Sequence, residues 1–162
     1  MLRSNFNRLS LALLLAAGTV TAAHADDHGS KGPMAPVLPK YQQECASCHL
    51  AYPAGMLPAA SWQRVMSSLG QHYGTDASLD AASVRELSSW LKTNAGSYKR
   101  VSEEPPQDRI TKSAWFLRQH RDGEVPAGVW KRASVGSPSN CTACHGNAAQ
   151  GNFNEHDVRI PK

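Results

Sequence analysis

The chain has 162 residues, of which 41% are hydrophobic and 19% charged, and its formal net charge is +4 at pH 7. Lys and Arg are interspersed with Asp and Glu and form no basic run, so the composition gives no indication of nucleic-acid binding. The length allows one ordinary domain or two small ones, and no apolar stretch reaches the roughly 18 residues that a transmembrane helix needs.

The first 25 residues have the pattern of a secretory signal peptide. Arg3 and Arg8 make a positive amino-terminal region, residues 9–17 are apolar, and Ala23-His24-Ala25 is typical of a cleavage site. Cleavage there would remove two arginines and lower the formal charge from +4 to +2. We therefore expect a mature protein in the periplasm that begins with a flexible arm over residues 26–39.

The sequence CASCH at residues 45–49 returns as CTACH at residues 141–145, and the two copies use all four cysteines of the chain. Two cysteines three positions apart with a histidine directly after them are the signature of c-type haem attachment. On a helical turn both sulfurs lie on one face and can form thioethers to one porphyrin, while the histidine binds the iron. A zinc site would need one tetrahedral cluster, and a thiol redox pair would need a βαβ context.

The motifs predict two covalently bound haem c groups. The attachment residues are Cys45 and Cys48 for the first haem and Cys141 and Cys144 for the second. His49 and His145 each supply one axial ligand.

Apolar periodicity predicts helices and no strands. Before residue 100 we expect helices from residue 40 to before Pro53, over 61–69 and over 80–95, the last two capped by Ser61 and Asp80, with Gly96 ending the third. Residues 97–109 form a polar connector with two prolines and mark a domain boundary. Beyond it, residues 110–120 have a helical pattern, and Asn140 is expected to cap a short helix at the second motif.

The predicted fold is therefore all-α, with two small haem-centred helical domains over residues 26–100 and 101–162. Domains of this size have little stability without a cross-link or a bound cofactor. A covalently held haem supplies a large apolar surface around which a few helices can pack.

The second axial ligand of the first haem decides its chemistry, since axial identity tunes haem potentials. Methionine is a poor candidate: Met34 lies in the arm, Met66 belongs to a helical stripe, and Met56 is a weak contender in a Pro/Gly loop. We predict His72, which a loop between Gly70 and Gly74 presents.

For the second haem the candidates are His120 and His156. His120 lies on the apolar side of the predicted helix, where an imidazole without a partner would be costly. His156 has the polar neighbours of a solvated turn. We favour His120, with His156 as the alternative. If both irons carry two protein ligands, neither is open to substrate, and the protein transfers electrons and is not an enzyme.

With these residues identified, the chain resembles the bacterial periplasmic dihaem cytochrome c family (DHC). The resemblance covers nearly all of the sequence after the signal peptide and is carried by residues 44–49, 51–53, 57–58, 62, 69–74, 76–79, 115–120, 130–132 and 159–161, together with the second motif. It implies a class I cytochrome c-like fold for the N-terminal domain and low-potential bis-histidine ligation at both haems. It also implies electron transfer from a membrane b-type cytochrome to an oxygen-binding monohaem cytochrome.

Other classes share some of these features. An electron-input subunit of a periplasmic reductase, of the nitrate reductase small-subunit type, is also a short dihaem bis-histidine protein and is the alternative function. A dihaem peroxidase needs about twice the length and one open iron, and a haem-based gas sensor also needs a vacant or labile position.

Overall fold

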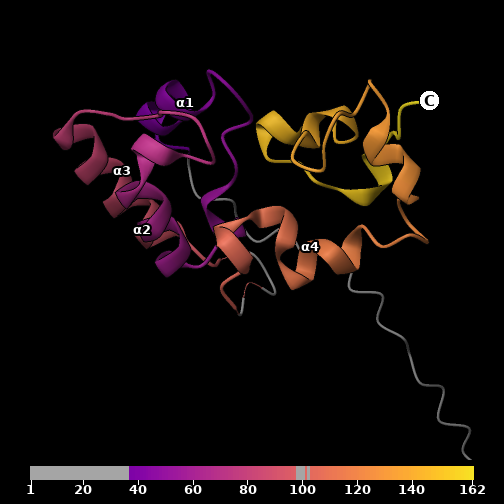
Figure 1. Ribbon diagram of the computed structural model, residues 1–162, viewed down its shortest axis with the longest axis horizontal. Coiled ribbons are helices and arrows are strands. Elements are labelled where there is room, and N and C mark those ends of the chain that lie inside the picture. Colours follow the sequence, from indigo (N-terminus) through magenta and orange to yellow (C-terminus); the bar gives the residue numbers. More distant parts are fainter. Residues whose placement is uncertain (1–36, 98–100, 102) are drawn as a thin grey trace, which may run out of the picture.

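A computed structural model of the chain describes residues 37–97, 101 and 103–162 (Figure 1). The expected signal peptide and Met34 lie outside the described residues. The described part of the chain is helical and contains no β-strand, apart from one isolated bridge between His72 and Thr75. The all-α fold predicted from periodicity is confirmed.

Three α-helices form the N-terminal part, on the left of Figure 1: α1 (Pro39–Cys45), α2 (Ala59–Ser67) and α3 (Ala81–Asn94). Helix α2 packs mainly against α3, and α1 also contacts α3. The core between them consists of Tyr41, Ala54, Leu57, Trp62, Met66, Leu87 and Leu91. Full burial of a leucine contributes about 1.5 to 3 kcal/mol to folding, so the α2–α3 contact stabilises the frame that carries the first motif.

The ends of these helices follow local chemistry. The Asp80 side chain accepts hydrogen bonds from the backbone amides of Ala82 and Ser83, which confirms it as the N-cap of α3. Gly96 adopts a φ of +62° just after α3, a conformation that glycine accepts without strain. The predicted cap at Ser61 is wrong, because α2 begins earlier, after Pro58, and Ser61 is fully buried inside the helix.

Short 3₁₀ helices flank α2. The first, η1 (Ala54–Met56), precedes it, and the second, η2 (Leu69–Gln71), follows it and is capped at its C-terminal end by His72. The side chain of Met56 is buried against Trp115 and Phe116, which come much later in the chain. Met56 therefore joins the two parts of the chain as a packing residue.

We define the C-terminal segment as residues 101–162. Its described residues form one α-helix, α4 (Ala114–Gln119), and otherwise short 3₁₀ turns. These are η3 (Pro106–Asp108), η4 (Ile110–Lys112), η5 (Ala127–Lys131), η6 (Cys141–Ala143), η7 (Ala148–Gln150) and η8 (Glu155–Asp157). Figure 1 shows α4 below the turns that lead to the C-terminus.

The single helix predicted over residues 110–120 is wrong. The chain forms η4 and α4 with a break at Ser113, whose extended backbone and side-chain hydroxyl cap α4 by accepting from the amide of Phe116. Asn140 precedes η6, but its side chain makes no cap hydrogen bond; its Nδ2 donates instead to the carbonyl of Val135.

Candidate functional site

The first motif lies at the end of α1. Cys45 is the last residue of this helix and packs against the N-terminal core, whereas Cys48 in the following turn is exposed. Burial raises the pKa of the Cys45 thiol to about 11. The Nδ1 atom of His49 lies 2.7 Å from the carbonyl of Leu50 and donates to it, which leaves Nε2 as the available ligand atom.

His72 lies opposite His49. Their ring centroids are 6.0 Å apart, and the two ring planes differ by 23°. The turn after η2 brings His72 to this position, closed by a hydrogen bond of 3.0 Å from the amide of Thr75 to the carbonyl of His72. We call Cys45, Cys48, His49 and His72 the first site.

The second motif begins with η6, and Cys144 follows this turn. Burial raises the pKa of the Cys141 thiol to about 11 and also raises that of Cys144. None of the four cysteines of the chain forms a disulfide. Both motifs thus present a pair of thiols beside a histidine.

His120 faces His145 across the second site, which we define as Cys141, Cys144, His145 and His120. The ring centroids are 6.2 Å apart, and the ring planes differ by 65°. His120 follows directly after α4, and its Nδ1 donates to the carbonyl of Phe116 over 3.0 Å. As at His49, this hydrogen bond leaves Nε2 available.

Aromatic side chains surround the second site. The Phe116 ring stacks on His120 at 4.0 Å between centroids, and Trp130 lies 6.0 Å from the same histidine. The Phe153 ring lies 5.4 Å from that of His145. These three aromatic residues belong to one hydrophobic cluster, so the histidine pair lies in an apolar environment.

The alternative histidine has a different environment. His156 is exposed in η8, where its amide donates to the side chain of Asn154. The structure thus places His120 opposite His145 and leaves His156 in a polar turn.

The donor sets fit haem iron. Two imidazoles bound to opposite faces of one metal ion, each with a nitrogen–metal bond of about 2.0 Å, have ring centroids roughly 6 Å apart. The two pairs have this spacing, at 6.0 and 6.2 Å. Burial lowers the pKa values of His72, His120 and His145, which favours the neutral imidazole that binds metal.

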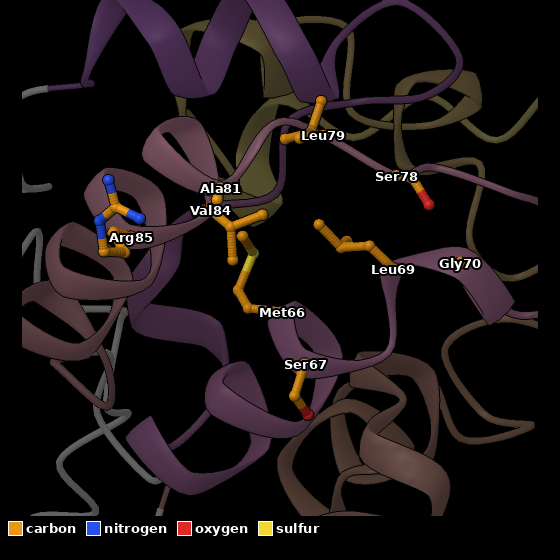
Figure 2. Close-up of a pocket in the computed structure, with 9 residues that line it drawn as sticks. All are labelled: Met66, Ser67, Leu69, Gly70, Ser78, Leu79, Ala81, Val84 and Arg85. Atoms are coloured by element: carbon orange, nitrogen blue, oxygen red, sulfur yellow. The ribbon is translucent and has the colours of Figure 1, made fainter.

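A pocket of about 480 Å³ opens beside η2, the segment that leads to His72 (Figure 2). Its wall includes the apolar side chains of Met66, Leu69, Leu79 and Val84, and Figure 2 shows Met66, Leu69 and Val84 directed towards a shared space. The Met66 side chain is packed in the core, so its helical position indicated its role correctly.

Sequence reasoning missed the aromatic neighbours of the ligand candidates. Tyr52 stacks on His49 with centroids 5.0 Å apart, and Tyr73 meets His72 edge-on at 4.9 Å. Both tyrosines are close in sequence to a motif histidine or to its proposed partner, which is a signal that could have found them. No local pattern indicates Phe153 or Trp130, since both reach the second site through tertiary packing.

The fold and the two sites define an all-helical protein with two attachment motifs, each with a second imidazole facing the motif histidine. Residues 41–153 match the family model for dihaem cytochrome c. The chain belongs to the dihaem cytochrome c family, as its motifs suggested, and accordingly carries two covalently bound haem c groups used in electron transport.

Solved structures agree with this assignment. A dihaem cytochrome c from Shewanella baltica OS155 is 38% identical with a TM-score of 0.67, and the match covers 78% of this chain and 95% of that one. A dihaem cytochrome c from Rhodobacter sphaeroides is 40% identical with a TM-score of 0.66, covering 74% and 99%. A further structure, of DHC purified from Rhodobacter sphaeroides, is 41% identical with a TM-score of 0.61, covering 73% and 98%.

A comparison with curated protein sequences found no match. Within the described residues, no helix combines the length and apolar character required to cross a membrane.

Proposed function

We propose that the protein is a periplasmic electron carrier whose two haem irons are each bound by two histidines. Cys45 and Cys48 would attach the first haem, with His49 and His72 as its axial ligands. Cys141 and Cys144 would attach the second, with His145 and His120 as its axial ligands. Each haem would belong to one domain, residues 26–100 with a class I cytochrome c-like fold and residues 101–162.

The observation that carries this proposal is the facing pair of imidazoles at each motif, with centroids 6.0 and 6.2 Å apart. The haem groups supply one-electron redox chemistry when bound. The histidine side chains would fill both axial positions and leave no position for oxygen, peroxide or a substrate, so the protein would not be an enzyme. Imidazole in place of a methionine thioether also favours a low potential.

The surroundings of the histidines support the same role. The backbone carbonyls of Leu50 and Phe116 accept from the Nδ1 atoms of His49 and His120, and such bonds orient a ligand and raise its basicity. The rings of Phe116, Trp130 and Phe153 limit water around the second pair. An iron kept in one coordination state reorganises little when its charge changes, which suits electron transfer.

The proposed donor is a membrane b-type cytochrome, and the proposed acceptor is an oxygen-binding monohaem cytochrome. The family resemblance and the signal-peptide pattern of residues 1–25 support this place in an electron-transfer chain. Isolation of the native protein tests the role: a carrier purifies alone, whereas a reductase subunit purifies with a large catalytic chain.

The axial assignment is tested by carbon monoxide binding to the reduced holoprotein at neutral pH. The wild type should form no adduct. His120→Ala should open the second iron and give one CO per protein, whereas His156→Ala should remain inert. A CO adduct of the wild type would contradict two closed irons, and CO binding to His156→Ala but not to His120→Ala would reverse the assignment at the second site.

A further inference from the structure

Tyr52 connects the first site to the second motif. Its ring stacks on His49 with an angle of 25° between the planes, and its hydroxyl donates to the carbonyl of Ser139 over 2.8 Å. Ser139 lies two residues before Cys141 in the sequence. The backbone carbonyl of Tyr52 accepts from the hydroxyl of Tyr41 over 2.7 Å, so the residue is held from both ends.

Tyr73 makes a corresponding connection at His72. Its ring meets His72 edge-on, and its hydroxyl donates to the carbonyl of Asp108 over 2.9 Å. The guanidinium of Arg109 lies 4.2 Å from the centre of the Tyr73 ring, on its face. Each of the two histidines is thus packed by a tyrosine whose hydroxyl is anchored on the C-terminal segment.

The backbone at the Tyr73 contact is unusual. Among the described residues, the non-glycine residues with positive φ are Tyr73, Gln107 and Asp108, with values of 50°, 59° and 54°. The carbonyls of Gln107 and Asp108 are the two that the Tyr73 hydroxyl approaches. Left-handed backbone is uncommon for residues other than glycine, although aspartate adopts it more readily than tyrosine or glutamine does. Three such residues meeting in one contact point to a constraint on the backbone here.

We propose that Tyr52 and Tyr73 are positioning residues that fix the orientation of the two axial imidazoles of the first haem by anchoring them to the C-terminal segment. The proposal rests on the axial ligation proposed above. It explains why the His49 and His72 planes are held within 23° of each other, although His49 is exposed and His72 is only half-buried. It also makes the electronic state of the first haem dependent on the segment that carries the second.

The test is low-temperature EPR of the oxidised holoprotein. In low-spin ferric haem, near-parallel imidazole planes separate the energies of two iron d orbitals, whereas near-perpendicular planes bring them together and raise the largest g value. The second pair, at 65°, therefore gives a separate signal that serves as an internal reference. Tyr52→Phe and Tyr73→Phe keep the rings but remove the anchoring hydroxyls.

Each variant should shift the largest g value of the first haem upwards or broaden that signal, and leave the second signal unchanged. Tyr52→Leu and Tyr73→Leu, which also remove the ring, should give larger shifts. Thr93→Val is a matched control, because it removes a hydroxyl-to-carbonyl bond of 3.0 Å within α3 away from both sites. It should leave both signals unchanged.

The outcomes separate the two proposals. Unchanged g values of the first haem in all four tyrosine variants would overturn the positioning role while leaving bis-histidine ligation intact. A high-spin signal in the wild type would overturn the ligation itself. Tyr73 is 45% exposed, so its phenylalanine variant should fold even if substitutions at Tyr52 do not.

Discussion

The planes of the two histidine pairs differ in their relative orientation, at 23° for His49 and His72 and 65° for His120 and His145. His49 is packed by Tyr52 and His72 by Tyr73, whereas His120 is stacked on Phe116. Different neighbours thus hold the two pairs of proposed axial ligands, which are chemically identical, in different arrangements. The two haems should consequently be distinguishable even though the proposed axial ligands of both are histidines.

Replacing His72 by methionine should raise the reduction potential of one haem and leave the other unchanged. A thioether favours the reduced iron relative to imidazole, and axial identity shifts haem potentials within a range of about 0.8 V. We expect an increase on the order of 0.1 V or more, measured by a spectroscopic redox titration. His156→Met is the matched control and should change neither potential; a shift in both potentials with His72→Met would argue against a local ligand role.

The helices of the N-terminal part are stabilised by a well-defined contact between α2 and α3. Leu87 is fully buried there, with an exposed fraction of 0%, whereas Leu117 on α4 is 58% exposed. Because both residues are leucines, the same substitution to alanine at the two positions shows how much of its effect comes from lost buried packing.

Leu87→Ala should lower the free energy of unfolding by about 2 to 5 kcal/mol, because it removes buried apolar surface and leaves a cavity. Leu117→Ala should change it by less than about 0.5 kcal/mol. Guanidinium unfolding of both variants provides the measurement. Equal effects at the two positions would show that the α2–α3 contact is not the stabilising core.

The cap of α3 predicts a pH dependence. Hydrogen bonds from the Ser83 hydroxyl and amide lower the pKa of Asp80 from 3.8 to about 2. Because the folded-state pKa is depressed, the stabilisation is present above the unfolded value near pH 4 and is lost as the pH falls towards 2.

Asp80→Ala should therefore lower the midpoint of thermal unfolding at pH 7, and its difference from the wild type should shrink between pH 4 and 2. Asp80→Asn keeps a capping oxygen without the charge and should show a smaller deficit with no contribution from this carboxyl to the pH slope. Thermal scans monitored by circular dichroism at several pH values measure this. A deficit of Asp80→Ala that stays constant down to pH 2 would contradict the linkage.

Across the whole molecule, the elements predicted correctly from the sequence are those whose position is specified by residues close to them in the chain. The three N-terminal helices follow apolar spacing, and the charged oxygen of Asp80 specifies the start of α3. The predicted N-cap at Ser61 was wrong because a serine directly before an apolar helical stripe has the sequence pattern of a cap, whereas α2 begins after Pro58. The break at Ser113 also depends on a local cap: its hydroxyl accepts from the amide of Phe116 at the start of α4, and its backbone amide closes the end of η4.

The structure of the C-terminal segment could be predicted only in part from residues close together in the sequence. Its 3₁₀ turns are too short to produce a periodic pattern. The segment is also packed through contacts between residues distant in sequence, such as Met56 with Trp115 and Phe116 of α4. The tyrosine anchors join Tyr52 to Ser139 and Tyr73 to Asp108, across separations of 87 and 35 residues. The sequence indicates haem attachment at the motifs, but the orientation of the proposed axial histidines depends on this tertiary packing.

Low-temperature EPR of the oxidised wild-type holoprotein tests bis-histidine ligation most directly, because it reports spin state and axial ligation at each iron. We predict two low-spin ferric signals of equal intensity, with different largest g values that reflect the 23° and 65° arrangements. A high-spin signal accounting for one of the two irons would show an open or water-bound position and would contradict an electron carrier with two closed haems.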